Sequence, residues 1–401
     1  MSGWTRRPAW KWRTERAPKI ITSLPEASQE RTTTTLSIRP TMTNNRQLLR
    51  WLTDQDGIEN LKTDTIPMPK PGKDEVLVKI SAVSLNYRDT EVVMGLYNYY
   101  DKPGEPKKLL VPTSDMCGII VAVGDESTDP NAWQVGDRVV STFLQSHLSG
   151  QVNAQHLATG LGKPLDGCLQ TYRIFPNTGL VRAPKHLTDE EASCLPIAAV
   201  TAWMSINGMQ PMGEIRGDGE TVVLQGTGGV SISGLQIAKA SGAKTIITSS
   251  SDEKLQKAKA LGADHVINYR TNPSWEEEVM KITGNAGADV IIETGGAGTL
   301  YKSLDCIGFG GLISCVGYVS GREDKAGEAR PNLNLLALRR TVTLKGIING
   351  PKDRFEEMCQ FYEKHQIRPV VDRVFSFKAA SEAFKYLASG SHFGKVVVKV
   401  D

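Results

Sequence analysis

The amino-acid sequence predicts an α/β protein in which a doubly wound parallel sheet is joined to an all-β, barrel-like module. From residue 221 onward, short β-branched runs alternate with helical patterns, and such alternation is typical of a parallel sheet covered by helices. From Gln47 to Phe175 the chain instead has strand-like runs separated by turns, as in DEVLVKISAV and WQVGDRVV. With 401 residues the chain is long enough for two domains with separate cores.

The unit from Thr221 to Ser251 has the order strand, glycine turn, helix, strand. Its turn contains Gly226, Gly228 and Gly229 directly after the apolar run TVVLQ. Glycines let a pyrophosphate approach the backbone, and the free N–H groups of the helix N-terminus hold its charge. Ser231 stands where the G-x-G-x-x-G fingerprint has its third glycine, and a tight turn without a ligand is the alternative. The unit predicts a Rossmann-type dinucleotide site.

The end of the second strand of this unit selects the dinucleotide. An NAD site usually has Asp or Glu there to bind the ribose 2′-hydroxyl. This chain has Ser249 and Ser250, followed by Lys254 in the next helix and Tyr269 after the third strand. Hydroxyls and a cation suit a 2′-phosphate, so we predict NADPH (NADP+) as the cofactor. Ser250 also has a second interpretation, as a helix cap that forms a capping box with Glu253.

Charge and cysteine content exclude several classes of function. The first 41 residues hold eight Lys/Arg and three Asp/Glu, so the basic excess lies in this segment and not in the body of the chain. No block of like charge indicates a nucleic-acid partner, and no apolar run reaches the length of a membrane span. The six cysteines are scattered without a C-x-x-C pair, which is typical of reduced thiols in a cytoplasmic protein.

The predicted organisation has three regions. Residues 1–44 are rich in Pro, Thr and Arg and are interpreted as a disordered extension. Their basic character is compatible with mitochondrial targeting, whereas Met42 offers an alternative start. Residues 45–195 and 350–401 form the predicted catalytic domain, because the closing run KVVVKV is expected to rejoin the first strands. Residues 196–349 form the predicted dinucleotide-binding domain.

Two local features lie near the boundary between these domains. The stretch LTDEEASCLPIAAVTAWMSI at 187–206 predicts one helix with Thr188 as its N-cap. The polar loop at 144–163 contains His147 and His156. Two loop histidines without cysteine neighbours are poor zinc ligands, so both are expected to face solvent.

Several motifs together resemble one family. In order, they are SLNYRD at 84–89, VPTSDMCGIIVAVG at 111–124, VGDRVV at 135–140, LPIAAVTAW at 195–203, GTGGVS at 226–231, LGADHVINY at 261–269 and HFGKVVV at 392–398. The chain resembles the medium-chain dehydrogenase/reductase superfamily over residues 47–401. It is most similar to the zinc-independent quinone oxidoreductase and enoyl reductase branch, which includes zinc-type alcohol dehydrogenase-like proteins. The resemblance implies a GroES-like barrel domain and a Rossmann domain with the active site between them.

The resemblance also implies that no zinc is bound. Zinc alcohol dehydrogenases of this superfamily use a Cys, a His next to a Glu, and a third Cys or Glu as ligands. The matching positions here are Asn86, Ser114 (before Asp115) and about Ile197, and none of these is a thiolate or imidazole. We therefore predict a metal-free site.

Catalytic roles follow from the same comparison. Tyr97 matches a tyrosine that enoyl reductases place over the cleft, where its phenol donates a proton or a hydrogen bond to the developing enolate. The alternative is that Tyr97 is an aromatic wall of the pocket, as Tyr87 also can be. Asn86 is expected to orient the nicotinamide or the substrate carbonyl. Arg88 and Asp89 are expected to form a structural ion pair.

Further residues are expected to contact the cofactor. The resemblance assigns Thr201 to the nicotinamide ribose, and Gly228, Gly229 and Val230 to the pyrophosphate. Ser250, Lys254 and Tyr269 are assigned to the 2′-phosphate and adenine. The nicotinamide is expected to meet Val316, Gly317, Asn349, Gly394 and Lys395. For Gly317 and Gly394 the alternative is turn geometry alone.

The combined prediction is an NADPH-dependent oxidoreductase that reduces an activated C=C bond or a quinone by hydride transfer. Two alternatives remain open: a metal-free carbonyl reductase or alcohol dehydrogenase of the same fold, and a non-catalytic NADPH-binding protein. The expected partner is a small-molecule substrate, with neither nucleic acid nor membrane. The resemblance implies a homodimer joined near residues 312–316 and 342–347.

Overall fold

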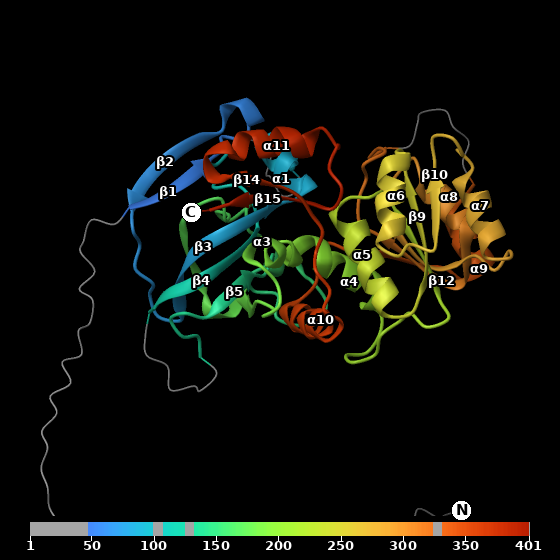
Figure 1. The fold of residues 1–401 in the computed structure, drawn as a ribbon, viewed down its shortest axis with the longest axis horizontal. Helices are drawn as coiled ribbons and strands as arrows, with labels where there is room; N and C mark the ends of the chain where they lie inside the picture. The colour runs from blue at the N-terminus through green and yellow to red at the C-terminus, as the bar shows by residue number, and fades with distance from the viewer. Residues whose placement is uncertain (1–46, 99–106, 125–131, 324–330, 401) are drawn as a thin grey trace, which may run out of the picture. The chain divides into compact units, whose positions relative to one another are not determined.

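The computed structural model describes residues 47–98, 107–124, 132–323 and 331–400 (Figure 1). The predicted extension at 1–44 lies outside these ranges. The described residues form a six-stranded parallel sheet and a seven-stranded, mainly antiparallel sheet, with a short two-stranded sheet beside them. The predicted α/β class, with a Rossmann sheet and a GroES-like barrel, is confirmed.

The parallel sheet has the strand order β10-β9-β8-β11-β12-β13. Its strands are β8 (Thr221–Gln225), β9 (Lys244–Ser249), β10 (His265–Asn268), β11 (Ala288–Glu293), β12 (Ile307–Cys315) and β13 (Thr343–Gly346). The order reverses between β8 and β11, which pair in parallel through Val223 and Ile291. The carboxyl ends of these two strands therefore form the switch point at which doubly wound sheets bind ligands.

Helices cover this sheet. They are α4 (Val200–Asn207), α5 (Gly229–Ala240), α6 (Asp252–Ala260), α7 (Trp275–Ile282), α8 (Leu300–Cys306) and α9 (Leu333–Arg340), while α10 (Lys352–His365) packs against α4. The strand side chains of β8 and β11 are almost wholly buried, as expected for strands packed on both faces. Trp203 of α4 and Phe355 of α10 pack into the same core as Leu224.

The second sheet has the order β14-β15-β3-β4-β5-β7, and β6 pairs with β3. Its strands are β3 (Glu75–Leu85), β4 (Asp115–Val123), β5 (Arg138–Ser141), β6 (Tyr172–Pro176), β7 (Leu180–Arg182), β14 (Val371–Ser376) and β15 (Lys395–Lys399). β1 (Gln47–Leu52) and β2 (Lys62–Pro67) pair separately. The closing strand β15 runs antiparallel to β3, with Val398 opposite Val83, so the C-terminal segment does return to the first strands (Figure 1).

Short helices connect the strands of this second sheet. They are α1 (Tyr87–Val93), α2 (Ala154–Leu157), α3 (Asp189–Ala192) and α11 (Ala380–Ala388), with 3-10 turns at Ile58–Asn60, Asn177–Gly179 and Phe377–Ala379. Ala383 and Phe384 of α11 pack in one core with Leu85 of β3 and Val398 of β15. Across the described ranges, no helix is both long and apolar enough to cross a membrane.

Three local predictions need correction. The stretch at 187–206 is not one helix, because α3 ends at Ala192 and a π-helical turn at Leu195–Ala199, containing Pro196, precedes α4. A proline removes a backbone donor, which explains the break. Thr188 does cap α3, since its hydroxyl accepts a hydrogen bond from Glu191 N at 3.2 Å.

The other two corrections concern side chains. Ser251, not Ser250, caps α6, because its hydroxyl accepts from Lys254 N at 3.3 Å. His147 does not face solvent: it is 3% exposed, its Nε2 lies 3.0 Å from Gly150 O, and its ring stacks on His156. Burial lowers the pKa of His147, so its neutral form is favoured.

Candidate active site

The glycine turn after β8 leaves open space over its backbone. Gly226 has a φ of +78°, a conformation that favours glycine, and in the described part of the chain no atom other than those of its two neighbours lies within 4 Å of where its Cβ would be. Gly228 caps α5 in an extended conformation, and only His392 Nε2, at 3.9 Å, lies that close to its Cβ position. Ser231, in place of the third glycine, donates a hydrogen bond to Gln225 O at 2.6 Å and so ties the helix to the strand end. The turn has the shape and the free helix N-terminus that a pyrophosphate requires.

Gly229 has a different reason to be glycine. A Cβ there would lie 2.6 Å from Cδ of Lys395 and 3.1 Å from Cβ of Ala198. Both distances are shorter than the normal contact between carbon atoms. The missing side chain of Gly229 therefore makes room for the stem of a lysine from the barrel sheet.

Lys395 connects the glycine turn to the barrel. Its ammonium donates to Leu85 O and to Asn86 Oδ1, each at 2.6 Å, and the residue is 4% exposed. The preceding Gly394, with a φ of +80°, donates its N–H to Thr227 O at 3.0 Å. The structure thus brings Asn86, Gly229, Gly394 and Lys395 together, and the Lys395 ammonium donates to the side-chain amide oxygen of Asn86.

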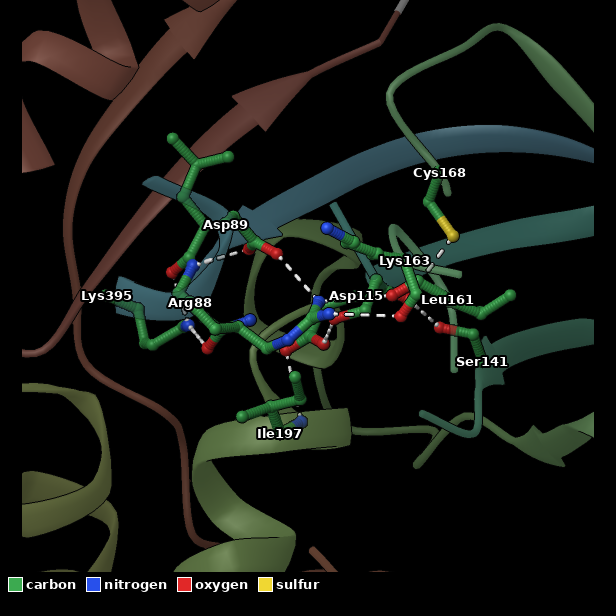
Figure 2. A network of polar contacts seen from close by, with 12 residues as sticks. Arg88, Asp89, Asp115, Ser141, Leu161, Lys163, Cys168, Ile197 and Lys395 are labelled. Atoms are coloured by element: carbon green, nitrogen blue, oxygen red, sulfur yellow. Dashed lines mark hydrogen bonds and ion pairs between the residues drawn. The ribbon is translucent and has the colours of Figure 1, made fainter. Parts of the chain in front are cut away.

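Two buried carboxyl groups lie beside this lysine (Figure 2). Asp89 accepts from Asn86 N at 2.8 Å and pairs with Arg88 at 3.2 Å, so the predicted ion pair is present. Asp115 accepts from Ile197 N at 3.1 Å. Burial raises the pKa of Asp89 to about 6, although the charge of Arg88 opposes the shift. Burial also raises the pKa of Asp115, against the opposing charge of Lys395.

The positions that match zinc ligands do not fit a zinc ion. The Asn86 carbonyl accepts from Lys395, the Ser114 hydroxyl donates to Asp115 at 2.7 Å, and Ile197 contributes only a backbone N–H. Zinc sites use thiolate, imidazole or carboxylate ligands. Among the described residues, no group of three or more His, Cys, Asp or Glu side chains is arranged to hold a metal.

Tyr97 lies half-buried against the guanidinium of Arg88. The Arg88 Cζ is 4.8 Å from the centre of the Tyr97 ring and 4.8 Å from that of Phe143. The backbone carbonyl of Tyr97 accepts from Lys163 Nζ at 2.9 Å. These contacts support the ring as a wall of the site.

The expected nicotinamide end is built from two sets of contacts. Asn349 Nδ2 donates to Thr201 Oγ1 at 3.3 Å and to Pro196 O at 3.1 Å, which ties α4 to the segment after β13. Val316 N donates to Glu293 O at 2.8 Å, and a Cβ on Gly317 would lie 2.7 Å from Thr294 O. Val316 and Gly317 therefore lie just after β12, whereas Asn349 lies after β13 and holds Thr201 of α4. Gly317 is required by a close backbone approach.

Sequence reasoning missed Glu293, which organises this strand end. Its carboxylate, 1% exposed, accepts from Gly295 N at 2.9 Å, Gly296 N at 3.0 Å and Gln225 Nε2 at 2.7 Å. An acidic residue that ends an apolar strand just before two glycines, ETGG, was the available signal.

Sequence reasoning also missed a buried carboxylate that connects helix α1 to the segment after β12. Glu91 of α1 is 4% exposed and accepts from the Tyr318 hydroxyl at 2.7 Å, and it also pairs with Arg322. Tyr318 lies after β12, and its ring is 6.5 Å from that of Tyr87. No sequence motif links these distant residues.

The expected adenine end differs in part from the prediction. Ser249 is 3% exposed and its carbonyl accepts from Tyr269 N at 3.1 Å, so its buried hydroxyl is a poor candidate for a phosphate. Ser250 is half-buried and Tyr269 is exposed. Lys254 Nζ donates to Gly390 O at 2.8 Å, which holds it at the rim between α6 and the segment before β15. Val230 packs against the core and contributes only its backbone to the turn.

The comparisons with known proteins agree with this architecture. Residues 72–185 match the family model of the alcohol dehydrogenase GroES-like domain, and residues 229–364 match that of the zinc-binding dehydrogenases. A zinc-type alcohol dehydrogenase-like protein of Schizosaccharomyces pombe is 41% identical over 351 residues, which cover 86% of this chain and 96% of the relative.

Two further relatives carry more specific names. An acryloyl-coenzyme A reductase of Sulfurisphaera tokodaii is 30% identical over 348 residues, covering 85% of this chain and 97% of the relative. The crystal structure of an NAD-dependent alcohol dehydrogenase is 30% identical, with a TM-score of 0.74 and coverage of 88% of this chain and 100% of that one.

The fold, the glycine turn and these relatives define the class of the protein as an oxidoreductase that uses a nicotinamide cofactor. The chain belongs to the medium-chain dehydrogenase/reductase superfamily.

Proposed function

We propose that this protein is an NADPH-dependent reductase of activated C=C bonds in enones or enoyl compounds, or of quinones, and that it works without a metal ion. The observation that carries the proposal is the Asn86 amide, whose oxygen accepts from the buried Lys395 ammonium at the position where zinc enzymes have a thiolate. Without a metal to lower the pKa of an alcohol, oxidation of simple alcohols loses its main assistance.

The residues of this chain bind the cofactor and orient the cofactor and the substrate. When bound, NADPH supplies the hydride. The open backbone at Gly226 and Gly228 holds the pyrophosphate, while Thr201 binds the nicotinamide ribose and Asn349 meets the nicotinamide. Asn86 orients the carboxamide or the substrate carbonyl. The Tyr97 hydroxyl, or water, provides the proton that completes reduction of the C=C bond.

The preference for NADPH rests on the end of β9. Ser250, Lys254 and Tyr269 lie there, and Asp252, the first carboxylate after β9 in the sequence, accepts from Asn268 Nδ2 at 2.8 Å. A carboxylate engaged by an amide is less available to the ribose hydroxyls. We expect Lys254→Met to weaken NADPH more than NADH, by roughly tenfold, because it removes one charge-assisted contact.

The test is a screen of NADPH oxidation by the purified protein against quinones, enones, enoyl thioesters and aldehydes, with the metal content measured on the same sample. We expect turnover of a C=C or quinone substrate that a chelator does not abolish. Product analysis with an enone separates C=C from C=O reduction. Oxidation of simple primary alcohols with NAD that is lost to a chelator would refute the proposal, as would tight NADPH binding without any turnover.

The role of Tyr97 has its own test. Tyr97→Phe keeps the ring that stacks on Arg88 and removes only the hydroxyl. If the phenol is the proton donor, kcat should fall by about 10²-fold. An unchanged kcat would leave water as the donor and Tyr97 as a wall of the site.

A further inference from the structure

The segment just before β15 presents a histidine to the glycine turn. Among the described residues, the neighbours of Gly228 in the chain aside, His392 Nε2 is the only atom within 4 Å of its Cβ position, at 3.9 Å. Two residues later, Gly394 donates to Thr227 O at 3.0 Å and bridges Gly228, which fixes this segment along the turn. His392 therefore lies beside the open space at the N-terminus of the 12-residue helix α5.

The polar and charged groups around His392 favour the binding of an anion. The imidazole is half-buried, and the described residues offer its Nδ1 no hydrogen-bond partner. The charged groups that face it are Lys254 of α6, Lys395 of β15 and Asp372 of β14. Asp372 is itself bonded to the Tyr386 hydroxyl at 2.6 Å. Lys395 is offset by the buried Asp115 and Asp89, so the positive charge that faces His392 and can balance a bound anion is the ammonium of Lys254.

We propose that His392 is a ligand of the dinucleotide pyrophosphate and that it takes up a proton when the nucleotide binds. The inference rests on the proposed function, since it requires a dinucleotide on the glycine turn. His392 is not among the residues that the sequence motifs assign to the cofactor.

The proton uptake follows from the change in the surroundings of His392 when the nucleotide binds. Without nucleotide, burial lowers the pKa of His392 to about 4, and the charges of Lys254 and Lys395 add to the effect, so the ring is neutral at pH 6 to 7. A pyrophosphate beside Nε2 adds negative charge, which favours the imidazolium and raises the pKa toward neutrality. Binding then draws one proton from solvent, and the imidazolium donates a hydrogen bond from Nε2 to a phosphate oxygen.

Calorimetric titration with NADH tests this. NADH is the probe because its pyrophosphate has no group that titrates near neutrality, whereas the 2′-phosphate of NADPH has a pKa near 6. Binding is measured at pH 6 in two buffers of different ionisation enthalpy, neither of them phosphate. We expect the wild-type protein to take up roughly half a proton or more per NADH, and His392→Gln to take up close to none.

Controls separate the possible outcomes. His365→Gln, which changes an exposed histidine at the end of α10, should keep the wild-type uptake. Equal proton uptake by the wild type and by His392→Gln would overturn the proposed role of His392 and would leave the proposed function untouched. Absence of binding of both NADH and NADPH to the wild type would overturn the proposed function as well.

A second measurement needs no variant. The Kd of the wild type for NADH should fall as the pH is lowered from 7.5 to 5, by at most about tenfold per pH unit, because one proton is linked to binding. A Kd that is constant over this range would also overturn the proposal.

Discussion

Two neighbouring glycines of the turn should respond in opposite ways to the same substitution. In Gly229→Ala the new methyl group meets Lys395 Cδ at 2.6 Å and Ala198 Cβ at 3.1 Å. Lys395 has little freedom to retreat, because it is buried and its ammonium holds two hydrogen bonds of 2.6 Å. Overpacking of this kind costs about 1–3 kcal/mol in the free energy of unfolding.

In Gly228→Ala the methyl group meets no atom closer than 3.9 Å, and the φ of −80° suits alanine. The cost to folding should stay below about 1 kcal/mol, the difference between glycine and alanine at an N-cap. The methyl group does, however, enter the space over the turn that a pyrophosphate needs. We therefore expect NADPH affinity to fall by at least about tenfold, equivalent to one lost phosphate contact.

The assay is urea unfolding of both variants, combined with nucleotide binding measured by fluorescence. The expected pattern is a stable Gly228→Ala that binds NADPH poorly and a destabilised Gly229→Ala. A Gly229→Ala protein as stable as the wild type would refute the packing argument. Unchanged NADPH affinity in Gly228→Ala would refute the placement of the pyrophosphate.

Further predictions concern the buried carboxylates. The pKa of Asp89 is raised from 3.8 to about 6 in the folded state, so its ionised form is disfavoured there, and the resulting gain in stability is present below pH 4 and lost as the pH rises through 6. The unfolding free energy of the wild type relative to Asp89→Asn should therefore increase as the pH is lowered from 6 to 4 in urea titrations, and a constant difference would contradict this. Glu293→Ala removes the acceptor of Gly296 N and of the buried Ser303 hydroxyl and should cost about 3 kcal/mol or more, whereas the partly exposed Glu278→Ala control should change stability by less than about 1 kcal/mol. Tyr318→Phe removes the 2.7 Å bond to Glu91 and should cost about 1 kcal/mol, measured in the same way, and a neutral effect would show that Arg322 satisfies that carboxylate alone.

Local patterns predicted much of this molecule. The β-branched runs, the glycine turn and the caps are properties of short segments, because alternation, helical spacing and turn chemistry act between near neighbours. The strand order at β8 and β11 then places the turn at the switch point. The failures also have local reasons: Pro196 divided a continuous helical pattern, and a cap moved from Ser250 to Ser251.

What the sequence determined by itself is the α/β architecture, the glycine turn and the absence of zinc-type ligands at Asn86 and Ser114. The tertiary structure alone decided how residues hundreds of positions apart share space. It placed the stem of Lys395 in the gap left by Gly229 and its ammonium on Asn86, and it buried Glu293 and Glu91 among their donors. Such contacts depend on packing between distant strands and loops, and packing leaves no periodic signal along the chain.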